Sequence, residues 1–425
     1  MARHKKIAIL TNMMEFNPGY SLTGIIKDQA RMLVKYGHEV HLFVNEQYHG
    51  EEFSEDVILH KKIPFTHLTD YRTRNELSTE HKQIINTTAV VLQKELVDFD
   101  IAFTHDFIFT GWFLPYGMGL QQASTKLPNV RWLHWIHSVP SIMSDWWLIK
   151  EYGPKHKIVF PNSTERLRVA EQYRGEIADI RIIPHIKDLR TFWDFHEDTC
   201  KFLDLHPNLM QSQVVQIYPA SSDRLHAKNV DKVIQVFANI KKLGVTCCLV
   251  IANQWATGKQ PKQNIEEFKE IARKNGLICT GNPNDEFIFT SEWCAEYENG
   301  IPTRILRELM LLQNLFVFPT REESFGLVGP EAALSSACLL VLNKSLAMMT
   351  EVHGNNGLYF DFGSFHHQWR CNDEVKYYHD LAFIILGRLR ENEAIVSNVH
   401  HRLRHNWDYL YHTYYGPIMQ ESELW

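Results

Sequence analysis

Short apolar runs alternate with helical patterns along most of this chain, and that alternation limits the possible folds more than any other feature. Lys6–Leu10 predicts a buried strand, and the pattern from about residue 22 to residue 36 predicts a helix. A second strand is predicted at Glu39–Val44. Strand–helix–strand units of this kind build parallel sheets, which bind ligands beyond the carboxyl ends of their strands. The chain is therefore predicted to be an α/β protein.

The chain is long enough for two domains, because 425 residues exceed one ordinary domain. The alternation stops at about residues 186–213, which lack clear periodicity, and resumes with a predicted strand at Val214–Tyr218. We predict an N-terminal domain over residues 1–190, completed by a C-terminal helix at 400–425. A C-terminal domain is predicted over 210–400, and two doubly wound domains of this kind are expected to face an interdomain cleft.

Composition narrows the classes of partner and compartment. Fifty acidic and 44 basic side chains give a formal charge of -6, so no bulk positive field favours nucleic acid or anionic membrane. The seven cysteines form neither a CxxC motif nor a Cys/His pair at zinc spacing, which favours a reducing compartment and no structural metal. The N-terminus lacks a signal-sequence apolar region, and no run approaches the roughly 18 apolar residues of a spanning helix. A cytoplasmic protein without a transmembrane segment is expected.

Polar residues follow two predicted strands of the N-terminal domain. Ile101–Thr104 ends at His105 and Asp106, and the strand from Val130 to Trp135 is followed by His137. Because parallel strands end at one edge of a sheet, His105 and His137 are candidates for a site there. Position alone is equally compatible with ordinary loop residues.

A strand–loop–helix stretch from Leu315 to Ser336, LFVFPTREESFGLVGPEAALSS, carries two glutamates in an unusual setting. Glu323 and Glu331 are separated by seven residues, and Gly326 lies between them. A carboxylate on the first turn of a helix can accept both hydroxyls of a ribose, which suits Glu331. The backbone N–H groups before the helix favour phosphate or sugar oxygens, Gly326 allows close approach, and Glu323 would face a sugar.

Two other interpretations of these glutamates stay open. A pair of carboxylates can hydrolyse a glycosidic bond, although such residues usually come from separate strands. Acidic residues at a helix start can also simply stabilise the helix dipole.

Glu323, Ser324, Phe325, Gly326 and Leu327, followed by Pro330, Glu331 and Ala332, resemble the E-x7-E signature of the retaining GT-B glycosyltransferases of glycosyltransferase family 4. Similar features extend from KIAILTN and YGHEV near the start to Gly357–Phe360. The resemblance implies a GT-B fold of two Rossmann-like domains, with a nucleotide-sugar in the C-terminal one. It also implies catalysis without a metal or another cofactor.

The resemblance further implies roles for residues of the C-terminal domain. Glu331 would bind the donor ribose, Glu323 the sugar hydroxyls, and the backbone of Ser324–Leu327 the diphosphate. Arg224 and Lys228, in SSDRLHAKN, would stabilise the negative charge of the leaving group.

This basic pair departs from the family pattern, because the loop before Arg224 is longer and the Arg-to-Lys spacing is one residue shorter. Taken alone, Arg224 and Lys228 would more often be solvated surface charges. Thr290, at the end of another predicted strand, is added to the donor-binding residues.

In the N-terminal domain, His137 of WIHSVPS resembles the family's histidine near the sugar, where a neutral imidazole can donate and accept. His105 and Asp106 resemble polar positions on the acceptor side. Tyr20 and Ser21 stand where the family usually has two adjacent glycines, which changes how the acceptor or the diphosphate is approached.

The predicted function is retaining transfer of a hexosyl or pentosyl group from a nucleoside-diphosphate sugar to a hydroxyl of a saccharide or small polar molecule. The mechanism would be a metal-independent front-face displacement. One alternative is the same chemistry on a hydroxymethyl base in DNA, another is a GT-B-fold sugar-nucleotide epimerase, and a third is a non-catalytic nucleotide-sugar binder. The DNA alternative depends on a basic and aromatic cluster made of His60, Lys61, Lys62, Phe65, Tyr71, Arg72, Arg74, His81, Lys82, Trp132 and Trp135.

Overall fold

A computed structural model describes residues 4–51, 53–54, 56–64, 71, 73–105, 113–138 and 148–420. The chain divides into two compact units, one of Met1–Asp188 with His405–Trp425 and one of Leu189–Arg404. Each unit is built on parallel β-structure with helices packed against it, so the α/β fold class is confirmed. The sequence predicts that the first domain ends at residue 190 and that the second begins at residue 210. The observed division falls after Asp188, so the residues between these borders belong to the second unit.

The first unit contains a seven-stranded parallel sheet with the order β3-β2-β1-β4-β5-β6-β7. Its strands are β1 (Lys6–Leu10), β2 (Glu39–Asn45), β3 (Val57–Ile63), β4 (Ile101–His105), β5 (Arg131–Trp135), β6 (His156–Phe160) and β7 (Ile180–Ile182). In β1, Ile9 lies opposite Leu42 on one side and Phe103 on the other. Because all strands run the same way, their carboxyl ends form a single edge of the sheet.

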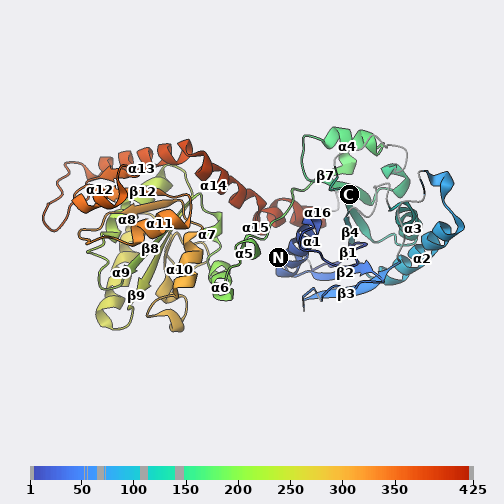
Figure 1. Ribbon diagram of the computed structural model, residues 1–425, viewed down its shortest axis with the longest axis horizontal. Coiled ribbons are helices and arrows are strands. Elements are labelled where there is room, and N and C mark those ends of the chain that lie inside the picture. The colour runs from blue at the N-terminus through green and yellow to red at the C-terminus, as the bar shows by residue number, and fades with distance from the viewer. Residues whose placement is uncertain are drawn as a thin grey trace. The chain divides into compact units, whose positions relative to one another are not determined.

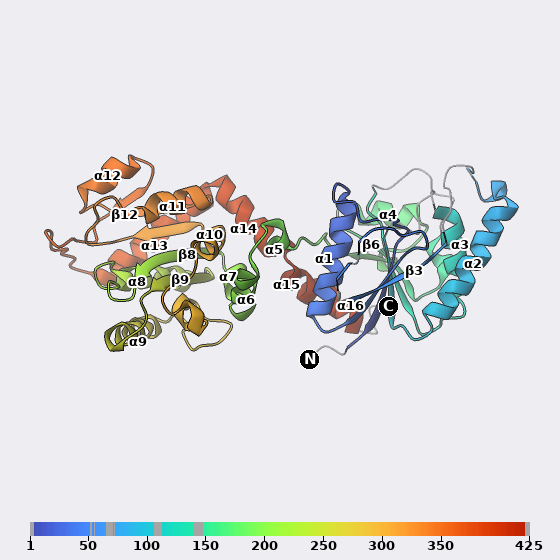
Figure 2. The same cartoon turned by 60° about the horizontal axis from the view of Figure 1, so that its bottom comes forward.

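Successive residues of β1 point to opposite faces of this sheet, as the period of two in a strand requires. Ile7 and Ile9 pack with α1 (Ser21–Lys35), whereas Ala8 and Leu10 pack with α2 (Thr79–Glu95). Figure 2 shows α1 and α2 on opposite sides of the sheet. Two further helices, α3 (Leu114–Ser124) and α4 (Arg166–Gln172), lie on the α2 face.

The end of the chain folds back onto the first unit. The single C-terminal helix predicted over residues 400–425 is wrong, because α14 (Glu393–His405) ends before Asn406. The side chain of Asn406 accepts a hydrogen bond of 2.9 Å from a backbone N–H and caps a new helix. The segment continues as α15 (Trp407–Leu410), a π turn at Tyr411–Tyr415 and α16 (Gly416–Gln420). Its apolar side chains cover the α1 face of the sheet.

The second unit has two three-stranded parallel sheets, β10-β9-β8 and β11-β12-β13. The strands are β8 (Val214–Ser221), β9 (Cys247–Gln254), β10 (Phe287–Phe289), β11 (Leu315–Phe318), β12 (Leu339–Asn343) and β13 (Leu358–Phe360). The buried amide of Gln216 joins the two sheets, donating to the carbonyl of Val317 at 3.0 Å and accepting from its N–H at 2.9 Å. The combined order is 10-9-8-11-12-13, which is the Rossmann order 3-2-1-4-5-6.

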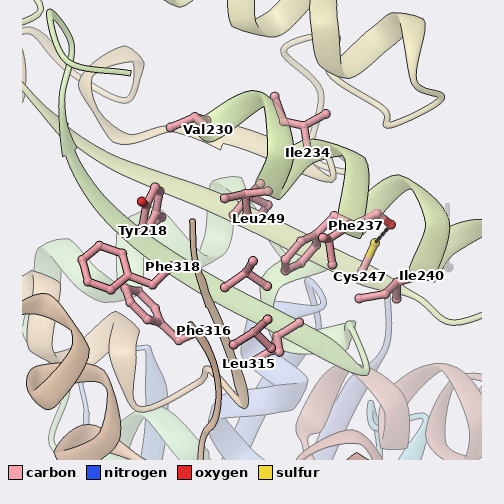
Figure 3. Close-up of a cluster of buried hydrophobic side chains, with 14 of the residues drawn as sticks. Tyr218, Val230, Ile234, Phe237, Ile240, Cys247, Leu249, Leu315, Phe316 and Phe318 are labelled. Atoms are coloured by element: carbon pink, nitrogen blue, oxygen red, sulfur yellow. Dashed lines mark hydrogen bonds between the residues drawn. The ribbon is translucent and has the colours of Figure 1, made fainter. Parts of the chain in front are cut away.

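The helices of the second unit are α5 (Leu189–Phe192), α6 (Glu197–Leu205), α7 (Asn208–Gln211), α8 (Val230–Lys242), α9 (Lys259–Lys274), α10 (Thr303–Met310), α11 (Val328–Ser335), α12 (Ala347–His353), α13 (Glu374–Glu391) and α14 up to Arg404 (Figure 1). One face of the β-structure packs Tyr218, Leu249 and Phe316 against α8 (Figure 3). The other face packs Ile217 and Val250 against α6 and α10.

The aperiodic residues after Asp188 are a structural part of the second unit. They form α5, α6 and α7, which are too short to show a helical period in sequence. The buried carboxylate of Glu308 accepts from the Thr199 hydroxyl at 2.5 Å and from the backbone N–H of His196 at 2.8 Å.

Within the described part of the chain, no helix has the length and apolar character needed to cross a membrane.

Candidate functional site

Two loops at the carboxyl edge of the second unit are tied to each other. One follows β8 and the other follows β11, the strands at which the order of the β-structure reverses. The Asn229 side chain donates to the carbonyl of Pro319 at 2.7 Å, and the Arg321 N–H donates to the carbonyl of Ala227 at 2.9 Å. Asn229 adopts the left-handed conformation, with φ of 50°. Open α/β sheets bind ligands at this reversal point, which makes the paired loops the candidate site.

Lys228 and Glu323 form an ion pair across the two loops. Their side chains are only 15% and 16% exposed, so the pair is shielded from most of the solvent. The hydroxyl of Tyr218 donates to the Lys228 carbonyl at 3.0 Å and fixes the backbone that carries the ammonium group. A charge held in a partly desolvated place acts more strongly on a neighbouring charge than one in bulk water. The structure thus brings together two of the predicted catalytic residues.

A second pair, Arg224 with Glu322, crosses the same two loops at 2.6 Å. These side chains are 47% and 54% exposed, and exposed pairs contribute little because water screens them. Arg224 therefore lies at the rim of the site, with its guanidinium partly in solvent.

Gly326 turns the chain between the two signature glutamates. Its φ is +74°, a conformation that L side chains rarely adopt, and an added Cβ would lie 3.0 Å from the ring of Phe318. Ser324, Phe325 and Leu327 flank this glycine with exposed side chains. The turn thus requires a glycine for both its conformation and its packing.

Helix α11 starts directly after this turn. Glu331 lies on its first turn with an exposed side chain, and it forms no ion pair with any residue the structure describes. The first N–H groups of a helix have no partner within the helix and favour a negative charge. The arrangement places a free carboxylate next to an anion-favouring helix start.

Thr290 lies at the end of β10 with a fully buried side chain. Its hydroxyl accepts from the Asn253 N–H at 3.2 Å, and the Asn253 side chain donates to the Ser291 hydroxyl at 2.8 Å. Thr290 therefore orders the ends of β9 and β10, and its hydroxyl is engaged inside the protein.

Trp255 belongs to this region and was missed by sequence reasoning. It follows β9 directly, is 62% exposed and has φ of 56°. The residues on both sides are anchored: the Gln254 carbonyl accepts from the Ser222 hydroxyl at 2.7 Å and from its backbone N–H at 2.9 Å, and the Ala256 N–H donates to the Glu298 carbonyl at 2.9 Å. A strained backbone of this kind persists only where its surroundings impose it, and it is most common at functional sites.

Trp255 follows β9, which lies between β8 and β10 in the sheet, and its indole is an exposed flat surface. Such a surface can stack on a planar ring. In the sequence, the only signal was a tryptophan placed directly after a strand, and no local pattern predicted its left-handed backbone.

In the first unit, His105 and His137 contact each other at the ends of β4 and β5. The His105 Nδ1 and the His137 Nε2 are 3.0 Å apart, and the His105 Nε2 lies 2.8 Å from the Gln29 side-chain oxygen. Because that oxygen only accepts, the proton of neutral His105 is on Nε2, and its Nδ1 accepts from His137. Both ring nitrogens of His105 are thus engaged within the protein, so His105 orients His137.

Burial keeps these histidines uncharged. It lowers the pKa of His137 to about 3 and brings the pKa of His105 well below its usual value. His185 stacks on His137 with ring centres 5.0 Å apart, and burial lowers its pKa as well. A neutral imidazole can hydrogen-bond a polar ligand without adding charge to the site.

Two further predicted acceptor-side residues, Tyr20 and Ser21, lie at the same edge of the sheet. Tyr20 and Ser21 are exposed at the start of α1, in the connection that follows β1. Asp106 lies outside the described residues.

The basic and aromatic cluster considered for DNA does not form as predicted. Trp132 and Trp135 are 1% and 2% exposed, and Tyr71 and His81 are also buried. Buried rings cannot stack on bases. Phe65 and Arg72 of this cluster lie outside the described residues.

Among the residues that the structure describes, no group of three or more His, Cys, Asp or Glu side chains is placed to hold a metal ion. The predicted donor-site residues themselves offer carboxylates, an ammonium and a guanidinium, a set suited to hydroxyl and phosphate oxygens.

No family model matches the chain, and no curated protein matches its sequence. Several solved structures resemble it at low similarity. A glycosyltransferase from Rickettsia africae is 14% identical, with 99% of this chain and 100% of that chain covered and a TM-score of 0.38. HepE from Anabaena in complex with UDP and glucose is 14% identical, with 96% and 97% covered and a TM-score of 0.33.

A third structure is an alpha-glucosyltransferase in complex with UDP-glucose and DNA containing an abasic site. It is 13% identical, with 96% of this chain and 95% of that chain covered and a TM-score of 0.29. At such identities and TM-scores, the likeness carries no activity over to this chain. The Rossmann order of the second unit stands on its own strand pairing.

Proposed function

We propose that this protein is a retaining glycosyltransferase that moves a sugar from a nucleoside-diphosphate sugar to a hydroxyl of a saccharide or small polar acceptor. The observation that carries the proposal is the shielded Lys228–Glu323 pair, which lies at the reversal point of the Rossmann order beside the start of α11. It supplies a cation for a diphosphate and a carboxylate for sugar hydroxyls at one place.

Donor binding would rearrange this ion pair. The diphosphate oxygens compete with Glu323 for the Lys228 ammonium, and the start of α11 adds N–H groups that favour the same anion. As Lys228 turns to phosphate, the Glu323 carboxylate becomes free to accept hydrogen bonds from the sugar. Glu331 accepts from the ribose hydroxyls, and the Trp255 indole stacks on the base.

In the transfer step, the bond between the sugar carbon C1 and the phosphate oxygen breaks while the acceptor oxygen bonds to C1 from the same face. The departing oxygen gains negative charge, which Lys228 stabilises and Arg224 supports from the rim. The acceptor's proton passes to the departing phosphate oxygen, so that a nucleoside diphosphate is released. No side-chain nucleophile, metal or other cofactor takes part in this scheme.

His137 would serve the first unit's side of the reaction. It remains uncharged at neutral pH because it is buried, and it is oriented by His105 and Gln29. An oriented neutral imidazole holds a sugar hydroxyl without opposing the positive charge that develops on the sugar.

The test is a panel of nucleoside-diphosphate sugars incubated with the protein and scored by release of the nucleotide. Each donor is offered with saccharides, with hydroxymethylated DNA and with no acceptor, in the presence and absence of EDTA. Saccharide-dependent release, an unchanged anomeric configuration by NMR and insensitivity to EDTA are expected. Conversion of the sugar without any acceptor would instead establish an epimerase, and absence of donor binding across the panel would end the proposal.

A further inference from the structure

A polar pocket of about 520 Å³ lies in the second unit, lined by residues of α8, α13 and the loops after β11 and β13. Its floor is formed by the buried residues Lys232, Phe362, Gly363 and Tyr378. Half-buried and exposed side chains with oxygen and nitrogen atoms rise around this floor, namely Asp231, Gln235, Arg321, Ser364, His367, Gln368 and Glu374. Pockets of this size hold small organic ligands.

The charges in this pocket balance. Lys232 and Arg321 are positive, and Asp231 and Glu374 are negative. None of these four side chains forms an ion pair with any residue that the structure describes. An anion would meet the two carboxylates, and a cation would meet the lysine and the arginine. The lining therefore favours a neutral ligand with many hydrogen-bonding groups.

Lys232 is the lining residue that most favours a ligand with hydrogen-bond acceptors. It is 8% exposed, and its ammonium donates to the Phe362 carbonyl and lies 4.4 Å from the centre of the Trp369 ring. An ammonium group has three donors, and a buried donor without an acceptor is costly. A ligand oxygen above the floor would satisfy this group.

A tight turn at Gly363 and hydrogen bonds from Asn343 fix the wall of the pocket. Gly363 has φ of +72°, and an added Cβ would lie 2.8 Å from Trp369, so the chain turns tightly there. The buried amide of Asn343 donates to the Gly363 carbonyl at 2.7 Å and to the Thr320 carbonyl at 2.8 Å. One side chain thus joins the wall of the pocket to the loop that carries Arg321 and Glu323.

We propose that this pocket is a second saccharide-binding site, separate from the donor site. Each sugar hydroxyl both donates and accepts, and the pocket offers acceptors on Asp231 and Glu374, donors on Lys232 and Arg321, and amides that do both on Gln235 and Gln368. Exposed aromatic surface on Phe365 is available for the apolar face of a sugar ring. The site requires no transfer chemistry and goes beyond the proposed function.

The test measures binding to the full chain by calorimetry and by saturation-transfer NMR. Probes are glucose, galactose, N-acetylglucosamine, their common disaccharides and, separately, inorganic phosphate. We expect at least one neutral saccharide to bind, and the Gln235→Ala/Glu374→Gln double variant to weaken it by about tenfold or more. The matched control is Glu393→Gln, which changes another first-turn glutamate outside the pocket and should leave binding unchanged.

A second pair of measurements separates this pocket from the donor site. Saccharide binding should survive in Lys228→Ala, and a saturating nucleoside diphosphate should not displace the saccharide. The proposal is overturned if no saccharide binds, if phosphate alone binds, or if the double variant binds as wild type. It is also overturned if the nucleotide displaces the saccharide, which would assign that binding to the donor site.

Discussion

The two units handle charge in opposite ways at the carboxyl edges of their sheets. In the first unit the edge carries the buried His105 and the half-buried His137, and burial keeps both neutral. In the second unit the corresponding edge keeps a lysine and a glutamate paired and partly shielded. A site built from uncharged hydrogen-bonding groups suits sugar hydroxyls, whereas a fixed charge pair suits a diphosphate. The same architecture therefore offers two different chemistries, decided by which residues end the strands.

The largest expected difference between the units is their response to acid. Burial lowers the pKa of His137 and of His156 to about 3, so as the pH falls the unfolded chain binds protons first. The stability from these groups is fully present above their unfolded pKa of about 6.5 and is lost progressively below it. At pH 5 the loss is about 2 kcal/mol for each histidine, from about 1.4 kcal/mol per pH unit.

Hydrogen exchange followed by mass spectrometry at pH values between 7.5 and 5 checks this expectation. Peptides from β4 and β5 should lose protection before peptides from β8 and β9, although His206 and His353 of the second unit also have lowered pKa values. His156→Gln should flatten the pH dependence of the first unit. Equal loss of protection in both units would break the comparison.

Lys228→Ala tests the charge pair of the second unit. Removing the ammonium leaves Glu323 unpaired in a shielded place and takes away the cation for the diphosphate. We expect the affinity for a nucleoside diphosphate to fall by about a hundredfold, because truncating one member of a shielded charge pair costs about 2–5 kcal/mol. Calorimetric titration measures this effect. Lys242→Ala, at the exposed end of α8, is the matched control and should bind as wild type.

Trp255→Ala separates the contribution of the base to nucleotide binding from that of the phosphates. Loss of a stacking surface should weaken the binding of a nucleoside diphosphate by about tenfold, within the range of about 1–3 kcal/mol per base. The binding of inorganic diphosphate should be unchanged. Trp255→Gly should lose the same affinity yet raise the melting temperature, because glycine adopts a positive φ without strain. An unchanged affinity in both variants would remove Trp255 from the site.

Arg224→Ala should have the smallest effect. The guanidinium and its partner Glu322 are about half exposed, and such a pair contributes about 0–1 kcal/mol. We expect less than about a fivefold change in nucleotide affinity, with a larger share of that change appearing at low salt. A loss as large as that of Lys228→Ala would place Arg224 on the diphosphate in the bound state.

Much of the fold could be predicted from the sequence, because buried parallel strands such as Leu315–Phe318 are continuous apolar runs with clear ends. The helices α5, α6 and α7 could not, since each is too short to show a period and depends on Glu308 and the second core. The break at Asn406 was also missed, because an asparagine in a helical pattern becomes a cap only when the chain must turn.

The sequence by itself determined the α/β class and the loop in which Glu323, Gly326 and Glu331 occur. Apolar periodicity and glycine are local properties, and a chain carries them before it folds. Only the tertiary structure decided that Lys228 pairs with Glu323, that Trp255 is held exposed in a left-handed turn, and that burial keeps His105 and His137 neutral. The ion pair and the pKa shifts depend on burial and on neighbours that are distant in sequence. They therefore arise only once the strands have come together.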